Sequence, residues 1–116
     1  MPAIPKPEPS ARVKRREQRE EAAISARVRA ECVKRDGHCR AKHLGGCAGP
    51  SEWAHAPWWT RAKTRGMAPE RRHTTADTLM LCRRHHARLD GRERPRLLII
   101  RAYAGCDGAL VWSEGE

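Results

Sequence analysis

The segment LMLCRRHHARLDG, residues 79–91, constrains the fold more than any other part of this 116-residue chain. Cys82 and His85 have the Cys-x-x-His spacing with which a thiolate and an imidazole at a strand-to-helix turn reach one zinc ion. On a helix that follows this turn, His86 and Asp90 share a face about 100° away from His85. One short helix can therefore serve a structural metal on one side and a second site on the other.

Composition and cysteine usage favour a metal-stabilised domain. The chain contains no Phe, one Tyr and four Trp, and a domain of 116 residues with so few large apolar side chains has difficulty burying enough surface alone. Its five cysteines are an odd number and no segment reads as an export signal, so metal ligation is favoured over a disulfide framework. Cys106 lies in an expected turn away from the other cysteines and is interpreted as a free thiol.

A glycine-rich knuckle supplies the remaining candidate ligands. Cys39 and Cys47 bound this segment with seven residues between them, more than the roughly two to four that usually separate paired zinc ligands. His43 lies inside the segment and is an alternative to Cys47. We favour Cys47, because two thiolates contribute more zinc affinity than one. The expected structural zinc site is closed and consists of Cys39, Cys47, Cys82 and His85.

The charge balance indicates a polyanionic partner. Lys and Arg number 24 against 14 acidic residues, a formal charge of +10. A charge run is often only a solvated face, but an excess this large for the size favours attraction to phosphate backbones. Between His55 and His73 the cations accompany Trp58 and Trp59, a pattern that suits contact with nucleic acid, although one indole is expected to supply core. The candidate nucleic-acid-binding residues are Arg61, Lys63, Arg65, Arg71 and Arg72.

Local signals in the first third of the chain predict a basic helix. Residues 1–9 contain four prolines and are expected to form a disordered tail. A helix is predicted over residues 10–34, with Ser10 as its N-cap. A narrow apolar stripe on this helix consists of Ile24, Val28 and Cys32.

Short strands are predicted on both sides of the basic segment. Glu52 to His55 looks like a strand in which Trp53 and His55 face one way while Glu52 and Ala54 face the other. A second strand over residues 79–81 leads into the helix that carries His85 and His86. Together with the first helix, these strands predict the α+β fold class.

The C-terminal third is predicted to be a β-hairpin. Its strands are expected over residues 96–103 and 109–112, followed by a solvated tail over residues 113–116. The longest strongly apolar run covers only residues 97–100, so we expect no membrane span and a cytoplasmic location.

Four pieces of the sequence occur in an order shared with a known family. They are the pair Cys39 and Cys47, the run Trp53-Ala54-His55, Asp77 five residues before Cys82, and the run from Cys82 through His85 to His86. This pattern resembles the HNH endonucleases, specifically small zinc-bearing members common in bacteriophages and bacteria, and extends from about residue 35 to residue 112. The resemblance implies a ββα-metal (His-Me finger) core within a nuclease domain over residues 35–116 that hydrolyses DNA phosphodiester bonds.

The resemblance also implies roles for individual side chains. His55 corresponds to the general base that deprotonates the attacking water, a task that suits a neutral imidazole. Asp77 stands where the family usually has an Asn that braces the loop and orients the base; a carboxylate accepts a hydrogen bond but cannot donate as an amide does. His86 corresponds to the ligand of the catalytic ion, expected to be Mg²⁺ or another divalent metal, whereas Zn²⁺ is expected at the structural site.

One position departs from the family pattern. The residue before the base is commonly a second ligand of the catalytic ion, but here it is Ala54, and a methyl group cannot coordinate. Asp90 is our expected replacement, because a carboxylate and an imidazole four residues apart on a helix can chelate one ion. His73 is the reserve candidate.

The departures at Ala54 and Asp77 motivate an alternative, a noncatalytic zinc-stabilised DNA-binding module. The two interpretations differ at His55, which only a nuclease needs. A redox or regulatory role for Cys32 or Cys106 has little support, because the chain contains no Cys-x-x-Cys motif. Double-stranded DNA is the expected partner. A phage origin, a host-cell cytoplasmic location and an association with DNA-packaging proteins are implied by the resemblance alone.

Overall fold

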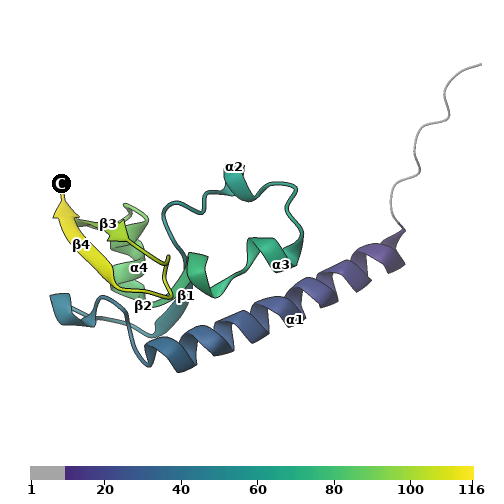
Figure 1. Cartoon of the computed structure of the whole chain (residues 1–116), viewed down its shortest axis with the longest axis horizontal. Coiled ribbons are helices and arrows are strands. Elements are labelled where there is room, and N and C mark those ends of the chain that lie inside the picture. Colours follow the sequence, from purple (N-terminus) through teal and green to yellow (C-terminus); the bar gives the residue numbers. More distant parts are fainter. Residues whose placement is uncertain (1–9) are drawn as a thin grey trace, which may run out of the picture.

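The computed structural model describes residues 10–116, so the predicted tail over residues 1–9 lies outside the described part. Its two antiparallel two-stranded sheets and its helices form a small α+β domain, as predicted (Figure 1). The principal elements are α1 (Ala11–Asp36), β1 (Ser51–His55), β2 (Thr78–Cys82), α4 (Arg83–Leu89), β3 (Arg96–Ala102) and β4 (Leu110–Gly115). The shorter helices are η1 (Lys42–Leu44), α2 (Arg61–Thr64), α3 (Pro69–Arg72) and η2 (Thr75–Asp77).

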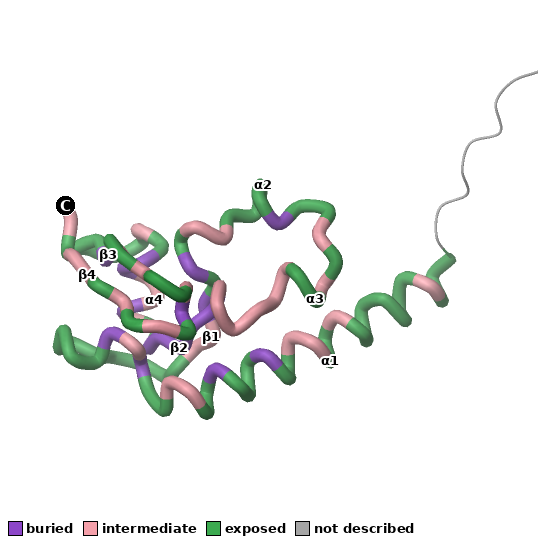
Figure 2. Tube along the Cα trace, viewed as in Figure 1, coloured by how far each residue is buried: buried purple, intermediate pink, exposed green. Residues whose placement is uncertain are grey.

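Helix α1 begins at the predicted N-cap, where the Ser10 hydroxyl oxygen accepts a hydrogen bond of 3.3 Å from the Val13 amide. The helix extends two residues beyond the predicted end at position 34, because Gly37, with φ 69°, provides the left-handed residue that ends it. Its apolar stripe is confirmed: Val28 and Cys32 are buried, and Ile24 packs beside them. The N-terminal half of α1 is largely exposed and extends away from the sheets (Figure 2).

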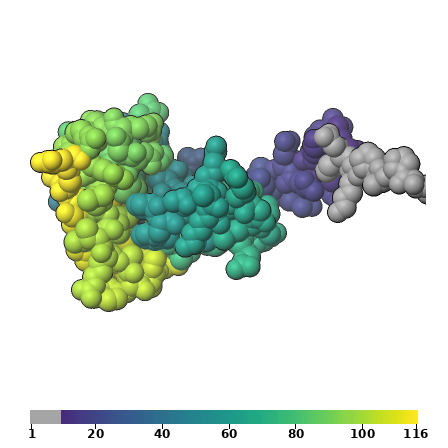
Figure 3. Space-filling model, turned by 90° about the horizontal axis from the view of Figure 1, so that it is seen from above, coloured from purple at the N-terminus to yellow at the C-terminus, as the bar shows by residue number. Residues whose placement is uncertain are grey.

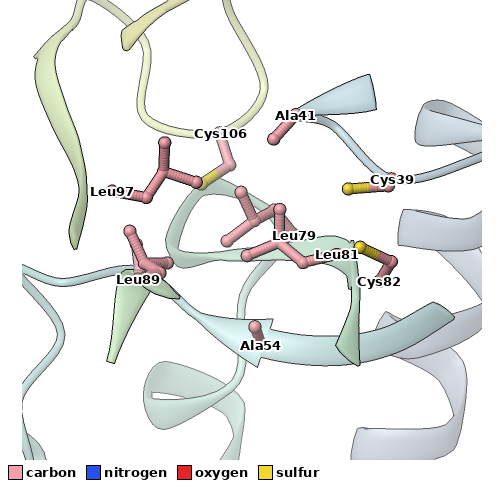
Figure 4. Close-up of a cluster of buried hydrophobic side chains, with 10 residues drawn as sticks. Cys39, Ala41, Ala54, Leu79, Leu81, Cys82, Leu89, Leu97 and Cys106 are labelled. Atoms are coloured by element: carbon pink, nitrogen blue, oxygen red, sulfur yellow. The ribbon is translucent and has the colours of Figure 1, made fainter. Parts of the chain in front are cut away.

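Strand β2 is buried along its whole length because both of its faces are covered. Met80 packs with Val28 and Cys32 of α1, whereas Leu79 and Leu81 belong to the core cluster that includes Leu97 of β3 and Leu89 of α4 (Figure 4). β1 pairs with β2 along one side, from Ser51 opposite Cys82 to His55 opposite Thr78. The alternation of side chains along β2 therefore separates two small cores.

The end of α1 is fixed against β2 by Asp36. Its Oδ2 accepts a 2.9 Å hydrogen bond from the Met80 amide, and its Oδ1 accepts from Arg35 and from Arg40 at 2.6 and 3.0 Å. Burial acts to raise the pKa of Asp36, but these donors lower it below its ordinary value. The anchored carboxylate places the following knuckle beside the start of α4.

Two parts of the chain differ from the sequence prediction. The sequence pattern predicted no helix in the basic segment after β1, but this segment contains α2, capped by the Thr60 hydroxyl at 3.2 Å from the Lys63 amide, and α3, which Pro69 begins. Figure 3 shows this teal segment between the sheets and the protruding part of α1. β4 also continues beyond the predicted strand end at residue 112 to Gly115, which pairs with Arg96, so residues 113–115 belong to a strand and not to a tail. Within residues 10–116, no helix is long and apolar enough to cross a membrane.

Candidate metal centre and basic pocket

Cys39, Cys47, Cys82 and His85 converge at the start of α4, as predicted. Their ligand atoms all lie within 4.8 Å of one another, close enough to bind a metal ion. The Nδ1 atom of His85 lies 3.4 Å from the sulfur of Cys39, 3.5 Å from that of Cys47 and 3.1 Å from that of Cys82. The alternative ligand His43 is exposed on η1 and is not part of the cluster, whereas Cys47 is.

The chemistry of this donor set fits a zinc ion. A neutral ring nitrogen carries either one proton or one lone pair, so three sulfur contacts to a single Nδ1 cannot all be full hydrogen bonds. In a tetrahedral site, zinc–sulfur and zinc–nitrogen bonds of about 2.3 and 2.05 Å place each sulfur about 3.6 Å from the nitrogen. The observed contacts of 3.1 to 3.5 Å are close to that spacing. The residues are consistent with a closed structural zinc site.

The thiol pKa values indicate how a bound cation would change the protonation of the cluster. Burial raises the pKa of Cys39 and of Cys47 above the ordinary value. Burial acts in the same direction on Cys82, but hydrogen bonds from the amides of His85 and Ala48 and from the neighbouring thiols lower the pKa of Cys82 overall. Without a cation the cluster therefore accommodates one thiolate most readily, whereas a bound divalent ion stabilises all three.

Local structure explains why these ligands meet. The sulfur of Cys82 caps α4 by accepting from the His85 amide at 3.4 Å, which places both ligands of the Cys-x-x-His pair on one turn. The knuckle returns along α4, where the Arg84 amide donates to the Ala48 carbonyl at 3.1 Å. Gly49, with φ 81°, lies so close to Arg83 that an added Cβ would meet its Cβ at 2.8 Å. Only glycine fits this close approach.

His55 lies on the opposite side of β1 from Ala54 and contributes to a site that is separate from the Cys₃His cluster. Its ring lies 5.2 Å from that of Trp53, which confirms that these two side chains share a face. The ring also lies 5.5 Å from that of His73, and the His55 Nε2 atom is 3.3 Å from the His73 Nδ1 atom. His73 therefore lies beside the predicted base. Within residues 10–116, no hydrogen bond joins His73 to His86.

A basic pocket opens beside His55, with a cavity volume of about 490 Å³. Three of the five predicted nucleic-acid-binding residues, Arg61, Arg65 and Arg72, line it. Lys63 lies instead over the ring of Trp59, 5.3 Å from its centroid, and Arg71 is exposed outside the lining. The complete lining is Glu21, His55, Trp59, Arg61, Thr64, Arg65, Gly66, Arg72 and His73. We refer to this site as the basic pocket.

The environment of His55 favours its neutral form. Desolvation by the surrounding side chains lowers the pKa of His55, and the Arg72 guanidinium, together with His73 whenever its ring is protonated, lowers it further. Asp77 opposes this shift, and His86, when its ring is protonated, adds a smaller contribution that also lowers the pKa of His55. The imidazole is therefore neutral, and able to accept a proton, at neutral pH.

Asp77 braces the segment after β1, although it does not hydrogen-bond to His55. Its Oδ1 accepts from the indole nitrogen of Trp58 at 2.8 Å, and its Oδ2 accepts from the Thr74 hydroxyl at 2.6 Å. Its carbonyl accepts from the Ala56 amide at 2.8 Å. Trp58 packs against the core as well, so it is the indole that supplies core, while Trp59 faces the basic pocket.

His86 and Asp90 come together, with Nε2 and Oδ2 3.4 Å apart. The other ring nitrogen, Nδ1, lies 3.0 Å from Oε1 of Glu52 on β1. The sequence analysis missed Glu52 as a site residue. Strand alternation was the available signal, because it placed Glu52 on the same face of β1 as Ala54, the face that α4 covers.

The structure thus contains a Cys₃His cluster able to bind a metal ion, a basic pocket beside His55, and a carboxylate–imidazole–carboxylate arrangement around His86. Comparison of the chain with protein-family models, with curated proteins and with solved structures finds no match. The chemistry of the described side chains is therefore the basis of the functional proposal.

Proposed function

We propose that this chain is a metal-dependent HNH endonuclease that hydrolyses phosphodiester bonds of double-stranded DNA. One observation carries the proposal: His55, whose pKa is lowered by burial and by neighbouring cations, lies at a pocket lined by Arg61, Arg65 and Arg72. A neutral imidazole beside three guanidinium groups combines a proton acceptor with an anion-binding surface. Hydrolysis of a phosphodiester requires both.

In the proposed reaction the guanidinium groups bind phosphate oxygens of the substrate, for which their planar donor geometry is well suited. His55 accepts a proton from the water that attacks phosphorus, while the bond from phosphorus to the leaving sugar oxygen breaks and that oxygen takes a proton from solvent. Asp77 accepts a hydrogen bond from the Trp58 indole and so keeps the segment after β1 in place. The base and the basic pocket therefore retain their relative positions. The other cations of the chain, which has a formal charge of +10, attract the remaining backbone.

The order of elements supports a ββα-metal core. β1 and β2 form an antiparallel pair, and α4 follows β2 directly. The Cys₃His cluster joins the knuckle to the β2–α4 turn. A structural zinc ion there would fix α4 against the strand pair that carries His55.

A catalytic divalent ion fits best at His86 and Asp90. An imidazole nitrogen and a carboxylate oxygen 3.4 Å apart are placed to share one ion, and Glu52 holds the second ring nitrogen at 3.0 Å. A carboxylate in that outer position orients a ligating imidazole and increases its basicity. When bound, Mg²⁺ or another divalent ion would supply neutralisation of the charge that develops on the phosphate oxygens.

The first experiment is a cleavage assay on supercoiled plasmid in Mg²⁺, Mn²⁺ or EDTA, comparing wild type with His55→Ala. We expect metal-dependent conversion to nicked or linear DNA, a loss of at least about 10²-fold in the variant, and unchanged DNA binding. His38→Ala is the matched control, because His38 is exposed and lies outside the basic pocket. Equal cleavage by wild type and His55→Ala would refute the assignment of the base.

A noncatalytic DNA-binding module is the second candidate, and Ala54 is the observation that favours it. Its methyl group is buried at the position where the family commonly has a second metal ligand. If wild type and His55→Ala both bind plasmid and neither cleaves it in any metal, this second function replaces the first.

A further inference from the structure

A chain of hydrogen bonds leads from α1 to the proposed general base. The Glu21 carboxylate oxygen Oε1 lies 3.1 Å from Nε2 of His73, and Nδ1 of His73 lies 3.3 Å from Nε2 of His55. Glu21 belongs to the N-terminal helix, His73 follows α3, and His55 ends β1. Three segments that are distant in sequence therefore meet at the imidazole of His73.

The Glu21 carboxylate, at one end of this series, determines which nitrogen of each imidazole carries the proton. An ionised carboxylate only accepts, so Nε2 of His73 carries the proton that it donates to Glu21. In a neutral His73 the other nitrogen, Nδ1, then has a lone pair, so Nε2 of His55 must be the donor across the 3.3 Å contact. A neutral His55 is left with its lone pair on Nδ1. Within residues 10–116 no hydrogen bond engages that atom.

Neighbouring side chains hold these two hydrogen bonds in place. The His73 side chain is only 10% exposed, and its ring lies 5.5 Å from that of Trp53, which also contacts His55. Arg72 pairs with the same Glu21 oxygen. The hydrogen bond from His73 is the largest cause that lowers the pKa of Glu21, in agreement with His73 as the donor.

We infer that Glu21 and His73 are positioning residues that hold the His55 ring with Nδ1 free as the basic nitrogen of the proposed nuclease reaction. The inference rests on the proposed function and adds to it two residues outside the motif segments. A shared metal ion explains the contacts less well. Glu21 lies against the far nitrogen of His73, so the carboxylate cannot join both imidazoles around one ion.

The direct test is spectroscopic and does not need cleavage. In ¹⁵N-labelled protein at pH 8, we expect His55 and His73 each to carry the proton on Nε2, with both ring protons slowed in exchange with solvent. In His73→Ala the His55 ring proton should lose this protection. A proton on Nδ1 of His73 in the wild type would overturn the inference.

The kinetic test compares single-turnover nicking at saturating DNA. We expect His73→Ala to slow nicking about 10²-fold without changing DNA affinity by more than about twofold, because a misplaced base affects only the chemical step. Glu21→Gln preserves the shape of the side chain but removes its charge, and we expect a loss of about tenfold. Glu20→Gln and His38→Ala are the matched controls, and zinc content with far-UV circular dichroism verifies that each variant is folded.

The outcomes separate the two proposals. If wild type cleaves and both His73→Ala and Glu21→Gln cleave at the wild-type rate, the positioning role is refuted while the nuclease remains. If wild type never cleaves, the proposed function fails. The ring spectrum then still decides whether the hydrogen-bond chain from Glu21 to His55 exists.

Discussion

His55 takes its chemical character from its neighbours. Burial lowers the pKa of this side chain, and His73 and Arg72, both carried on the segment after α2, act in the same direction. Asp77 opposes them from η2, and His86 contributes weakly from α4. The protonation state of one imidazole therefore depends on side chains from several different elements.

A pH profile follows from this environment. Since the pKa of His55 in the folded protein is lower than the ordinary imidazole value of about 6.5, the neutral base persists below that pH. Cleavage should rise with pH through the lowered pKa and be constant at neutral pH. Arg72→Gln removes one of the cations, so the pKa of His55 rises and the acidic limb of the profile moves to higher pH.

Arg71→Gln is the matched control for this profile, because the Arg71 side chain is exposed and is not among the groups that shift His55. Both substitutions remove one positive charge, and because only Arg72 lines the basic pocket, the profile is measured at saturating DNA. Only Arg72→Gln should move the acidic limb of the pH profile. An equal displacement in both variants would mean that net charge, and not the contact environment of His55, determines the profile.

At the scale of elements, the connection between β1 and β2 depends on Asp77. Asp77→Ala leaves the Trp58 indole nitrogen and the Thr74 hydroxyl without their acceptor, and we expect a loss of about 2 kcal/mol in the free energy of unfolding. Asp77→Asn keeps one oxygen for Trp58 and offers an amide donor to the Thr74 oxygen, so its cost should stay below about 1 kcal/mol. Urea denaturation monitored by Trp fluorescence measures both values, and equal losses would contradict the bracing role.

Local periodicity made some of these features predictable. The repeat of Val28 and Cys32 identified the buried face of α1, and two-residue alternation placed Trp53 beside His55. The Cys-x-x-His spacing located the Cys₃His cluster. Each of these signals lies within a few residues of sequence, so secondary-structure geometry alone was sufficient.

Long-range pairs could not be predicted in the same way. Glu52 meets His86 across 34 positions and Glu21 meets His73 across 52, and both contacts depend on how a helix packs on a strand pair. The short helices after β1 were missed because four residues are too few for a helical repeat to be visible. Their signals were the cap Thr60 and the proline at Pro69.

At the scale of the whole molecule, the domain has little apolar core for its extent of 64 × 30 × 27 Å. Its two buried clusters contain few large side chains, and Cys39 and Cys82 of the metal cluster are themselves part of the core. Structural zinc sites contribute about 10 kcal/mol or more of binding free energy, comparable to the entire stability of a typical domain, about 5–15 kcal/mol. The fold should therefore depend on the ion.

Removal of zinc is the corresponding test. We expect one zinc per chain, and we expect a strong chelator or Cys82→Ser to abolish cooperative thermal unfolding. Cys106→Ala is the control, because Cys106 is equally buried but lies outside the metal cluster, so this variant should retain its zinc. Elemental analysis together with circular dichroism measures both properties. A zinc-free chain that unfolds cooperatively at the wild-type temperature would contradict the expectation.

The spacing of the cluster also bears on the order of events during synthesis. Cys39 and Cys47 leave the ribosome well before their partners, since Cys39 and His85 are separated by 46 positions. Two thiolates alone form an incomplete site, so the early segment must wait until β2 and the first turn of α4 emerge. With zinc bound as we expect, metal capture, closure of this long loop and pairing of β1 with β2 would become one step. The rate at which the chain matures should accordingly follow the supply of free zinc at the time of translation.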